Sequence, residues 1–307
     1  MPRVSVNICC YNGEKHITSA VQSVLNQTFS DLEIIVINDG SKDGTEKAVL
    51  AFQDVRIKYY FQQNEGLAKT RNRAFALSGG EFITILDQDD IWEPEKLALQ
   101  VDVMERNPEV GVVYSDVYVI DEHDIIRGTG RRARYRRGKV APELLKGNYI
   151  YCPTVMFRAS VLKKAGQFRT DLKIGEEYDM YLRLARICAF DFVDKPLARY
   201  RVHSDNASRD MVRNYTETVM CLTDFAAAAN DEKLSRSAMW HADINRLKLM
   251  AALVWDRKCK EVSDILPKLR SGFLIGAAGF GLRLLAFAPH WIARFFLLPL
   301  KSAGIVR

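Results

Sequence analysis

The chain has 307 residues, of which 48% are hydrophobic and 27% are charged. This composition is typical of a globular protein with one large or two modest domains, and it excludes a small scaffold that depends on disulfides for its core. The six cysteines fall at no metal-ligand spacing, and the N-terminus has no charged-then-apolar signal segment. We therefore expect a reducing, cytosolic environment.

The net charge of +6 comes from one block of basic residues: Arg127, Arg131, Arg132, Arg134, Arg136, Arg137 and Lys139. Without these seven positive charges the net charge would be −1. A block of this kind is typical of a solvated loop, and the alternative is a surface that binds an anionic or phosphate partner.

The first 90 residues alternate apolar strand patterns with helical patterns. In chain order these are "VSVNICC", a helix over 14–26, "LEIIVIND", a helix over 45–52, "IKYYF", a helix over 67–77, and "EFITILD". Repeated βα units predict a parallel sheet covered by helices on both faces.

The next elements are a helix over 94–107 opened by Pro94, the strand "VGVVYSDVYVI", the basic block, a short helix over 142–146 and the strand "YCPTVMF". They are followed by the helix "EEYDMYLRLARI", with acids in its first turn, and by "FDFVDKPLARYRVH", which predicts one or two strands. Proline at a first helical turn and acids at a helix N-terminus are both favourable. After about Asn214 the pattern predicts helices only.

The most apolar part of the chain is "SGFLIGAAGFGLRLLAFAPHWIARFFLLPLKSAGIVR". Arg283, His290 and Arg294 interrupt it and Pro289 breaks it, whereas a spanning helix needs about 20 apolar residues with few charges. The pattern favours a basic amphipathic segment over about 272–301 that lies in a membrane interface. A helical hairpin packed on the main domain and a spanning helix are the alternatives.

Polar residues follow three predicted strands: Tyr11 and Asn12, residues 38–41, and residues 87–90. Ligands of parallel α/β sheets bind beyond the carboxyl ends of the strands, so these groups should meet at one edge.

In "ILDQDDIW", Asp87 and Asp89 offer the oxygen ligands that Mg²⁺ or Mn²⁺ takes when it bridges a diphosphate. The alternative is that Asp89 or Asp90 caps the following helix. In "INDGSKDGT", Asp39 can accept hydrogen bonds from a base or a ribose, and Tyr11 in "CCYNG" offers a stacking surface beside Asn12.

These motifs together resemble a known family. In order and spacing, "VSVNICCYNGEKHITSAVQSVLNQTFSDLEIIVINDGSKDGT", "NEGLAKTRNRAF" and "ITILDQDDIWEPEKL" resemble the nucleotide-sugar-binding half of inverting family-2 glycosyltransferases of the GT-A fold. "GQFRTDLKIGEEYDMYLRLA" and "YRVHSDNAS" resemble that family's acceptor half, and the resemblance covers about residues 3–208.

The resemblance implies an α/β fold of the GT-A class, with a Rossmann-like, mostly parallel central sheet flanked by helices. The glycosyltransferase domain would span 1–208, with the nucleotide-sugar half at 1–120 and the acceptor half at 140–208. A helical C-terminal region would span 209–307.

The resemblance also implies roles for individual residues. Tyr11, Asn12 and Asp39 would bind the nucleotide, with Asp39 bonding the ring N–H of a base that is usually uracil. Arg71 would lie near the nucleotide, and Asp87 near the ribose or the metal. Asp89 would ligate Mn²⁺ or Mg²⁺, and His203 would complete the metal or diphosphate shell.

The general base of the family is the aspartate of a Glu-Asp pair that opens the helix "EEYDMYLRLA". Here the pair is Glu176-Glu177, so Glu177 takes the position of the base, and Glu176 and Asp179 are its substitutes. A second departure is Cys9-Cys10, where the family commonly has Pro-Thr.

The resemblance implies transfer of a sugar from a nucleotide donor, usually UDP-linked, to a hydroxyl by single displacement with inversion. The amphipathic segment and the basic block favour a glycan or lipid-diphosphate-linked acceptor in polysaccharide or lipopolysaccharide synthesis, with the enzyme peripheral on the cytoplasmic face of the plasma membrane.

Three other functions stay open. A nucleotidyltransferase would need a glycine-rich phosphate loop with a lysine, which "CCYNGEKH" does not supply. Nucleic-acid binding through "RRARYRR" is disfavoured because the block is short and the remaining chain is near neutral. A protein that binds sugar nucleotides without catalysis is the third, because Glu177 departs from the family pattern.

Overall fold

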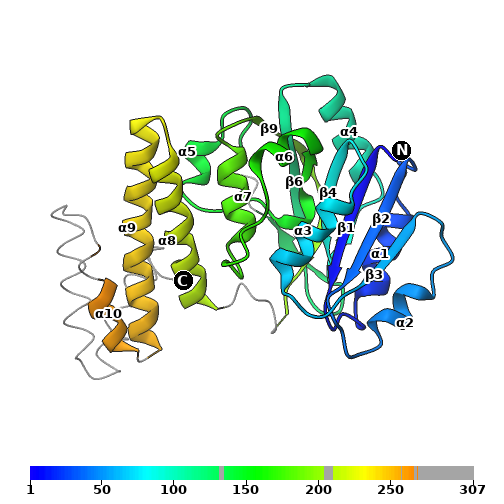
Figure 1. Ribbon diagram of the computed structural model, residues 1–307, viewed down its shortest axis with the longest axis horizontal. Coiled ribbons are helices and arrows are strands. Elements are labelled where there is room, and N and C mark those ends of the chain that lie inside the picture. The colour runs from blue at the N-terminus through cyan, green and yellow to red at the C-terminus, as the bar shows by residue number, and fades with distance from the viewer. Residues whose placement is uncertain (131–134, 204–209, 257, 266–267, 269–307) are drawn as a thin grey trace. The chain divides into compact units, whose positions relative to one another are not determined.

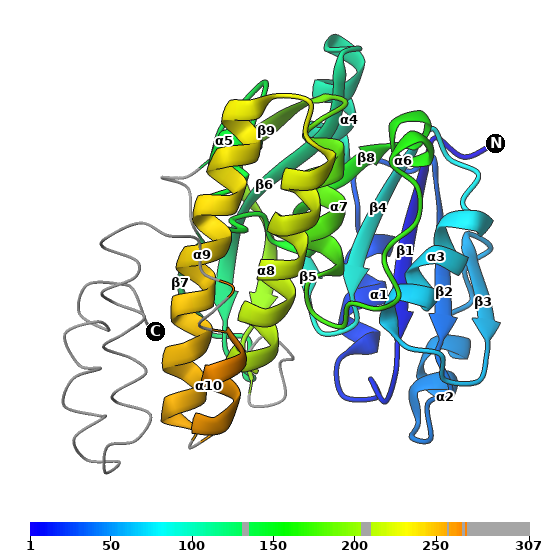
Figure 2. The ribbon, with the colours of Figure 1, turned by 60° about the vertical axis from the view of Figure 1, so that its left-hand side comes forward.

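The computed structural model describes residues 1–130, 135–203, 210–256, 258–265 and 268. The chain divides into two compact units, residues 1–204 and 205–307. The first unit contains the sheet and the second contains helices (Figures 1 and 2). The predicted boundary between 208 and 209 lies outside the described residues.

The strands of the first unit are β1 (Val4–Cys10), β2 (Leu32–Asn38), β3 (Ile57–Phe61), β4 (Phe82–Asp87), β5 (Ile91–Trp92), β6 (Val110–Ile120), β7 (Ile126–Thr129), β8 (Met156–Arg158) and β9 (Ala189–Arg201). In the described chain they form one nine-stranded sheet in the order β3-β2-β1-β4-β8-β6-β9-β5, with β7 paired to β6. The first four are mutually parallel, as the repeated βα pattern predicts.

The register of the parallel strands aligns their carboxyl ends. Cys9 of β1 lies opposite Ile37 of β2 on one side and Asp87 of β4 on the other. The residues that follow these strands therefore emerge at one edge of the sheet, which is the predicted place of the site.

The helices of this unit are α1 (Ile17–Leu25), α2 (Thr45–Leu50), α3 (Leu67–Leu77), α4 (Lys96–Arg106), α5 (Ala141–Leu144), α6 (Ala159–Ala165) and α7 (Glu176–Leu184). All of them fall within or overlap the helical patterns of the sequence except α6, which was not predicted. A short 3₁₀ helix, η2 (Cys152–Thr154), precedes β8.

Helices cover both faces of the sheet. On one face, Val21 of α1 and Val101 of α4 belong to the same buried cluster as Val6 and Ile8 of β1. On the other face, Ala74 of α3 packs on β1 and β2. All seven residues of β1 are buried, which is why its sequence is almost continuously apolar.

One predicted strand differs from the observed structure, and a stretch predicted as one or two strands forms one. "YCPTVMF" is a strand only from Met156 onwards, because Cys152–Thr154 form η2. Pro153 has no N–H for a strand ladder and fits the tight turn. The stretch "FDFVDKPLARYRVH" forms the single strand β9, whose register with β6 shifts near Pro196.

The second unit contains α8 (Met211–Ala228), α9 (Glu232–Trp255) and α10 (Cys259–Ile265). Helices α8 and α9 lie side by side (Figures 1 and 2), and Tyr215 shares an apolar cluster with Met250 and Val262. Asp231 caps α9 by accepting hydrogen bonds from the backbone N–H groups of Lys233 and Leu234.

Within the described part of the chain, no helix is long and apolar enough to cross a membrane. The predicted interface segment at 272–301 lies outside the described residues.

Candidate active site

The loops after β1 and β2 are held together by hydrogen bonds from backbone N–H groups to side-chain oxygens. Asn12 adopts a left-handed conformation (φ 49°), its N–H donates to Ser41 Oγ at 2.9 Å, and its Oδ1 accepts from the N–H of Lys42 at 2.9 Å. Asparagine tolerates this conformation better than most residues. The two predicted nucleotide-binding loops therefore form one joined surface.

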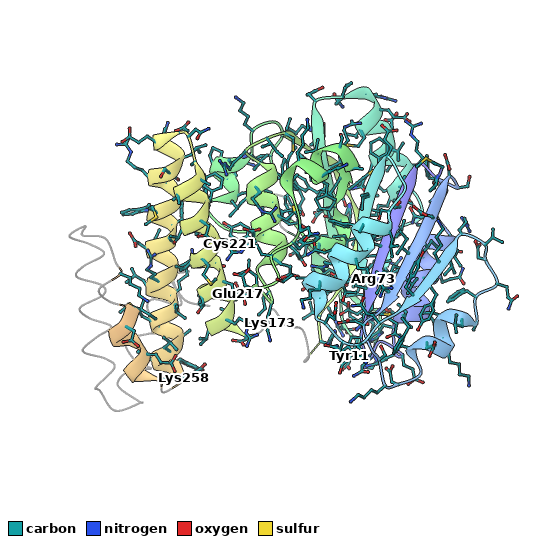
Figure 3. All side chains as sticks on the ribbon, in the orientation of Figure 1. Tyr11, Arg73, Lys173, Glu217, Cys221 and Lys258 are labelled. Carbon is teal, nitrogen blue, oxygen red and sulfur yellow. The ribbon has the colours of Figure 1, made fainter. Side chains whose placement is uncertain are left out.

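Tyr11 lies at the carboxyl end of β1 (Figure 3), and the residue is 44% exposed. Its N–H donates to Gln88 Oε1 at 2.9 Å, and its carbonyl accepts from Gln88 Nε2 at 3.2 Å. Gln88 thus fixes the backbone of Tyr11 to the acidic loop and leaves the ring exposed.

Asp39 is buried, with 4% of its surface exposed. Its Oδ1 accepts from Gln62 Nε2 at 2.6 Å and from the N–H of Glu65 at 2.9 Å, and its Oδ2 accepts from the N–H of Gly66 at 2.9 Å. A carboxylate has about four acceptor positions, so these bonds leave room for one further donor. Gly66 (φ 90°) precedes α3, so Asp39 also fixes the start of the helix that carries Arg71.

Arg71 is buried at the centre of a group of three acids. Its Nη1 lies 2.7 Å from Glu176 Oε1 and 2.9 Å from Glu177 Oε1, and its Nη2 lies 2.7 Å from Asp87 Oδ1. Nη2 also lies 3.4 Å from Cys152 Sγ. The guanidinium is 1% exposed and joins residues from α3, β4, η2 and α7.

One guanidinium pairs with three carboxyl groups in this cluster. Negative charge is therefore in excess, which favours protonation of a carboxyl group. Burial, together with the charges of Glu176 and Asp87, raises the pKa of Glu177 to about 7, although Arg71 opposes the shift. A carboxyl group with a pKa near 7 can exchange a proton at neutral pH.

Asp87, Cys152 and Glu177 also have ligand atoms within 4.8 Å of one another, a spacing that could hold a metal ion. All three contact Arg71, whose positive charge already balances part of theirs. The chemistry of this group is therefore that of a carboxyl pair held by a guanidinium.

Asp89 and His203 meet although 114 residues separate them. The His203 Nε2 lies 2.9 Å from Asp89 Oδ2, and both side chains are half-buried. The antiparallel pairing of β5 with β9 brings them together, because Ile91 lies opposite Arg199. A carboxylate oxygen suits Mn²⁺ or Mg²⁺, and an imidazole nitrogen is a ligand of transition-metal ions.

Asp90 does not cap a helix, which was one reading of the sequence. It is buried, its Oδ1 accepts from the N–H of Arg201 at 2.8 Å, and α4 begins at Lys96 without a side-chain cap. Burial, together with the charges of Asp89 and Asp87, raises the pKa of Asp90 well above its ordinary value. Asp90 therefore links the acidic loop to β9 through this hydrogen bond.

Asp179 lies in the same helix as Glu177 but in a different set of contacts. Its Oδ2 lies 2.7 Å from Arg183 Nη2, and its Oδ1 lies 3.7 Å from Arg169 Nη1. The site geometry thus groups Glu176 and Glu177 with Arg71, and groups Asp179 with other arginines.

The part of the chain that carries most of these residues matches a known family. The family profile described as glycosyl transferase family 2 matches residues 5–166, more than half of the chain. The chain belongs to glycosyltransferase family 2. The matched stretch includes Tyr11, Asp39, Arg71, Asp87 and Asp89.

Two curated relatives illustrate the extent of the similarity. An uncharacterised glycosyltransferase of Rickettsia typhi is 30% identical over 221 residues, which cover 70% of this chain and 69% of the relative. An uncharacterised glycosyltransferase of Rickettsia conorii is 29% identical over 244 residues, which cover 75% of this chain but 39% of the relative. The chain thus matches less than half the length of that larger protein.

Two solved structures share the fold. Staphylococcus aureus TarS 1–349 in complex with UDP-GlcNAc has a TM-score of 0.63 at 20% identity, covering 82% of this chain and 72% of that one. The mannosyltransferase PcManGT of Pyrobaculum calidifontis, in complex with GDP-Man and Mn²⁺, has a TM-score of 0.63 at 18% identity, covering 99% and 86%. The predicted GT-A α/β fold is confirmed.

Three contacts of this family-2 glycosyltransferase were not predicted from the sequence. Gln88 stands in the middle of the acidic loop, and Arg201 in "YRVH" donates from Nε to the carbonyl of Asp89 at 2.8 Å. Both lie inside motifs that the sequence singled out, so attention to their neighbours could have found them. Cys152 gave no signal, because its contact with Arg71 depends on the turn formed by η2.

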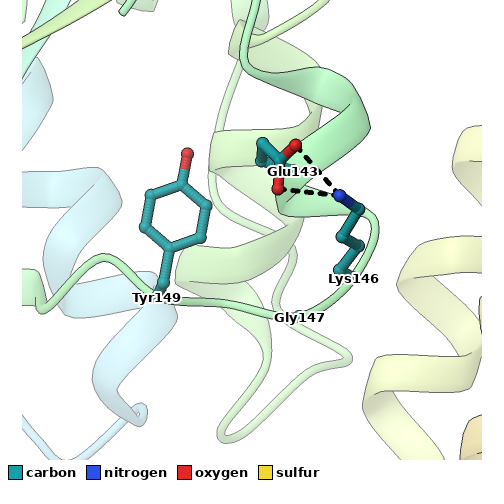
Figure 4. A pocket seen from close by; sticks show the side chains of 4 residues that line it. All are labelled: Glu143, Lys146, Gly147 and Tyr149. Carbon is teal, nitrogen blue, oxygen red and sulfur yellow. Dashed lines mark hydrogen bonds and ion pairs between the residues drawn. The ribbon is translucent and has the colours of Figure 1, made fainter. Parts of the chain in front are cut away.

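A small cavity of about 160 Å³ lies beside α5 in the predicted acceptor half. It is lined by Glu143, Lys146, Gly147 and Tyr149, and the Glu143 carboxylate pairs with Lys146 (Figure 4). Tyr178, next to Glu177, donates its hydroxyl to the carbonyl of Leu144 at 2.7 Å and so ties α7 to α5.

The basic block lies partly outside the described residues, since 131–134 are not described. In the described part, Tyr135 is buried and packs against Tyr114 and Phe192. Arg137 pairs with Asp191 and stacks over Phe192. The aromatic residue of "RRARYRR" is therefore part of the core and is not a surface for stacking bases.

Proposed function

We propose that this family-2 glycosyltransferase moves a sugar from a UDP-linked donor to a hydroxyl of a glycan or lipid-linked acceptor, by a single displacement with inversion that depends on Mn²⁺ or Mg²⁺. The observation that carries the proposal is the pairing of Glu177 with Arg71 at the strand edge that also bears Asp89 and His203. This edge offers a group that can accept a proton and a pair of metal donors.

The donor nucleotide is assigned to the joined loops after β1 and β2. The exposed ring of Tyr11 offers a stacking face, and Asn12 holds the two loops in register. The Asp39 carboxylate keeps one acceptor position for a ring N–H, which a uracil supplies. The UDP-GlcNAc complex of TarS supports a uridine donor, while the GDP-Man complex of PcManGT makes guanosine the alternative.

Asp89 and His203 are the residues assigned to the metal. Their donor atoms converge at 2.9 Å, and their oxygen-and-nitrogen set suits a divalent ion that also takes phosphate oxygens. A bound Mn²⁺ or Mg²⁺ would neutralise the charge that develops on the departing diphosphate.

Glu177 is assigned the role of general base. Its carboxylate would accept the proton of the acceptor hydroxyl while the hydroxyl oxygen forms a bond to the anomeric carbon. The bond from that carbon to the diphosphate oxygen then breaks and the configuration inverts. Arg71 holds Glu177 in place through a 2.9 Å contact.

The proposed acceptor and the proposed attachment to a membrane surface are supported by the sequence alone. The basic amphipathic segment at 272–301 supports attachment to a membrane, and the basic block supports an acceptor that carries phosphate. Both ideas lead to a lipid-diphosphate-linked glycan at the cytoplasmic face of the plasma membrane.

The test is nucleoside diphosphate release from a panel of sugar nucleotides with Mn²⁺, Mg²⁺ or EDTA. We expect one UDP-sugar to be turned over with metal and not with EDTA. Glu177→Gln should lower turnover by about 100-fold or more while UDP still raises the melting temperature with metal present. Asp89→Asn should lose the metal-dependent stabilisation by UDP.

Two control variants match these substitutions. Glu232→Gln removes a first-turn acid from α9, so it separates the role of a base from that of a helix-end charge. Asp102→Asn removes an exposed carboxylate paired with Arg106. Normal turnover by Glu177→Gln, with bound UDP, would show that the base is misassigned, and binding without turnover in the unmodified protein would favour a non-catalytic sugar-nucleotide binder.

A further inference from the structure

Three consecutive backbone carbonyls of the segment 153–155 accept hydrogen bonds from three buried side chains. Trp92 Nε1 donates to the carbonyl of Pro153 at 2.7 Å. Gln100 Nε2 donates to the carbonyl of Thr154 at 2.6 Å, and Thr84 Oγ1 donates to the carbonyl of Val155 at 2.5 Å. We call Thr84, Trp92 and Gln100 the carbonyl clamp.

The clamp residues come from three different elements. Thr84 lies in β4, Trp92 in β5 and Gln100 in α4, and all three are buried. Buried carbonyls need donors, since an unpaired one costs about 1–3 kcal/mol. The clamp satisfies these carbonyls with side chains, because the segment there is a turn and not a strand ladder.

Lys96 sets the orientation of the Gln100 amide. Its Nζ lies 2.7 Å from Gln100 Oε1 and 3.3 Å from Thr84 Oγ1, and it stacks over the ring of Trp92 at 3.9 Å from the centroid. An ammonium or amine donor facing Oε1 leaves the NH₂ end of Gln100 toward Thr154. Lys96 therefore contacts all three members of the clamp.

The clamp brackets the acidic loop and reaches Arg71. The loop 87–90 runs between Thr84 and Trp92 in the chain, and the held segment begins at Cys152. Cys152 Sγ lies 3.4 Å from Arg71 Nη2, the same nitrogen that contacts Asp87. A shift of this segment would therefore move the wall against which the guanidinium rests.

We propose that Thr84, Trp92 and Gln100 are positioning residues, which fix the segment 152–155 and thereby hold Arg71 between Asp87 and Glu177. The predicted effect on kcat rests on the proposed function, because Arg71 acts on turnover through the proposed base. None of the three side chains contacts substrate in this account.

Two substitutions test the clamp without changing side-chain volume much. Thr84→Val removes the hydroxyl donor to Val155, and Thr84→Ser keeps it. Gln100→Glu keeps the acceptor for Lys96 but cannot donate to Thr154 when ionised. We expect Thr84→Val and Gln100→Glu to lower kcat by about tenfold to a hundredfold with donor KM within about twofold, and Thr84→Ser to restore kcat.

Ser5→Ala is the matched control. Ser5 is buried in β1 of the same sheet, and its hydroxyl donates to Glu33 Oε1 at 2.6 Å at the amino end of the strand. It should lower the melting temperature about as much as Thr84→Val while leaving kcat unchanged. The comparison separates a loss of stability from a loss of position.

Alkylation of Cys152 by iodoacetamide, followed by peptide mapping, gives a readout that needs no activity. In the unmodified protein the reaction should be slow, because the thiol is buried and burial raises its pKa well above the ordinary value. In Thr84→Val and Gln100→Glu the segment is released, so alkylation should be at least tenfold faster, with no change for Ser5→Ala.

Faster alkylation together with reduced kcat supports the proposal. It is overturned if alkylation stays slow, if kcat is unchanged despite faster alkylation, or if Thr84→Ser is as impaired as Thr84→Val. If the unmodified protein turns over no donor, the proposed transfer has failed, and faster alkylation still supports the clamp. If Thr84→Val does not fold, Gln100→Glu decides the outcome.

Discussion

At the scale of single residues, the charge balance around Arg71 decides the chemistry of the site. Asp87, Glu176 and Glu177 share its two terminal nitrogens at 2.7–2.9 Å. Glu176 is almost fully buried, whereas Glu177 is 21% exposed at its side chain. The more accessible of the two glutamates is thus also the one that we propose as the base.

The pKa of Glu177 predicts a pH dependence for turnover. Burial raises this pKa to about 7, and only the carboxylate can accept a proton. At saturating donor, turnover should therefore rise with pH, reach half its plateau near pH 7, and fall about tenfold per pH unit well below that. Initial rates between pH 5 and 9 measure it, and a flat profile over this range would contradict the assignment.

Substitution of Arg71 should cause a large loss of stability. Arg71→Met leaves three carboxyl groups without their guanidinium, and breaking a buried ion pair from one side costs about 3–5 kcal/mol. Burial already raises the pKa of Glu177, and Arg71 opposes that shift, so loss of Arg71 should raise this pKa further. Protonation of Glu177 then relieves part of the loss, and the deficit should be larger at pH 8 than at pH 5. Urea denaturation at both pH values measures this.

The matched comparison for Arg71→Met is Arg106→Met. Arg106 is 75% exposed at its side chain and pairs with Asp102 in α4. An exposed ion pair contributes little, so we expect a change below about 1 kcal/mol at either pH. Equal losses for the two variants would mean that the buried cluster does not stabilise the fold.

At the scale of elements, the strand ends and the segments that cross between them place the site. Parallel register aligns the ends of β1, β2 and β4, while antiparallel pairing of β5 with β9 carries His203 to Asp89. At the opposite edge of the sheet, chain segments also approach one another closely. There Gly80 packs directly on the backbone of β1.

A side chain at position 80 should disturb the packing at this edge of the sheet. A Cβ at this position would lie 2.6 Å from the backbone nitrogen of Ser5 and 2.9 Å from the carbonyl of Phe82. Backbone cannot move aside easily, so Gly80→Ala should destabilise by about 1–3 kcal/mol. Gly128→Ala in β7, where a Cβ meets nothing within 4 Å, should change stability by less than about 0.5 kcal/mol in the same denaturation experiment.

At the scale of the whole molecule, the chain divides into a sheet-containing unit and a helical unit. The proposed donor and base sites lie entirely in the first unit, whereas the predicted membrane segment belongs to the sequence of the second. Attachment to a membrane and donor chemistry should therefore be separable.

Deletion of residues 272–307 tests this separation. The truncated chain should leave the membrane fraction and still hydrolyse donor with metal. In the full chain, Arg283→Glu with Arg294→Glu should weaken binding to anionic vesicles, because each basic residue near such a surface contributes about 1 kcal/mol. Unchanged fractionation of the truncated chain would reject the membrane segment.

The sequence determined most of the elements and the family. The apolar runs of β1, β2 and β4 and the helical patterns between them fix a parallel βα unit, because hydrophobic periodicity is a local property. The family resemblance implied roles for Arg71 and Asp87 near the nucleotide or metal and for Glu177 as the base. Local pattern could not identify Cys152–Thr154 as a turn, because neighbouring β-branched and apolar residues also suit a strand.

The tertiary structure decided which charges meet. Asp87 faces Arg71, Asp89 faces His203, and Asp90 is held by the backbone of Arg201, so three adjacent acids have three different partners. Those partners come from α3 and from the end of β9, far apart in the chain. Contacts of this kind depend on the register of strands and the packing of helices across the sheet, and no local pattern in the sequence encodes them.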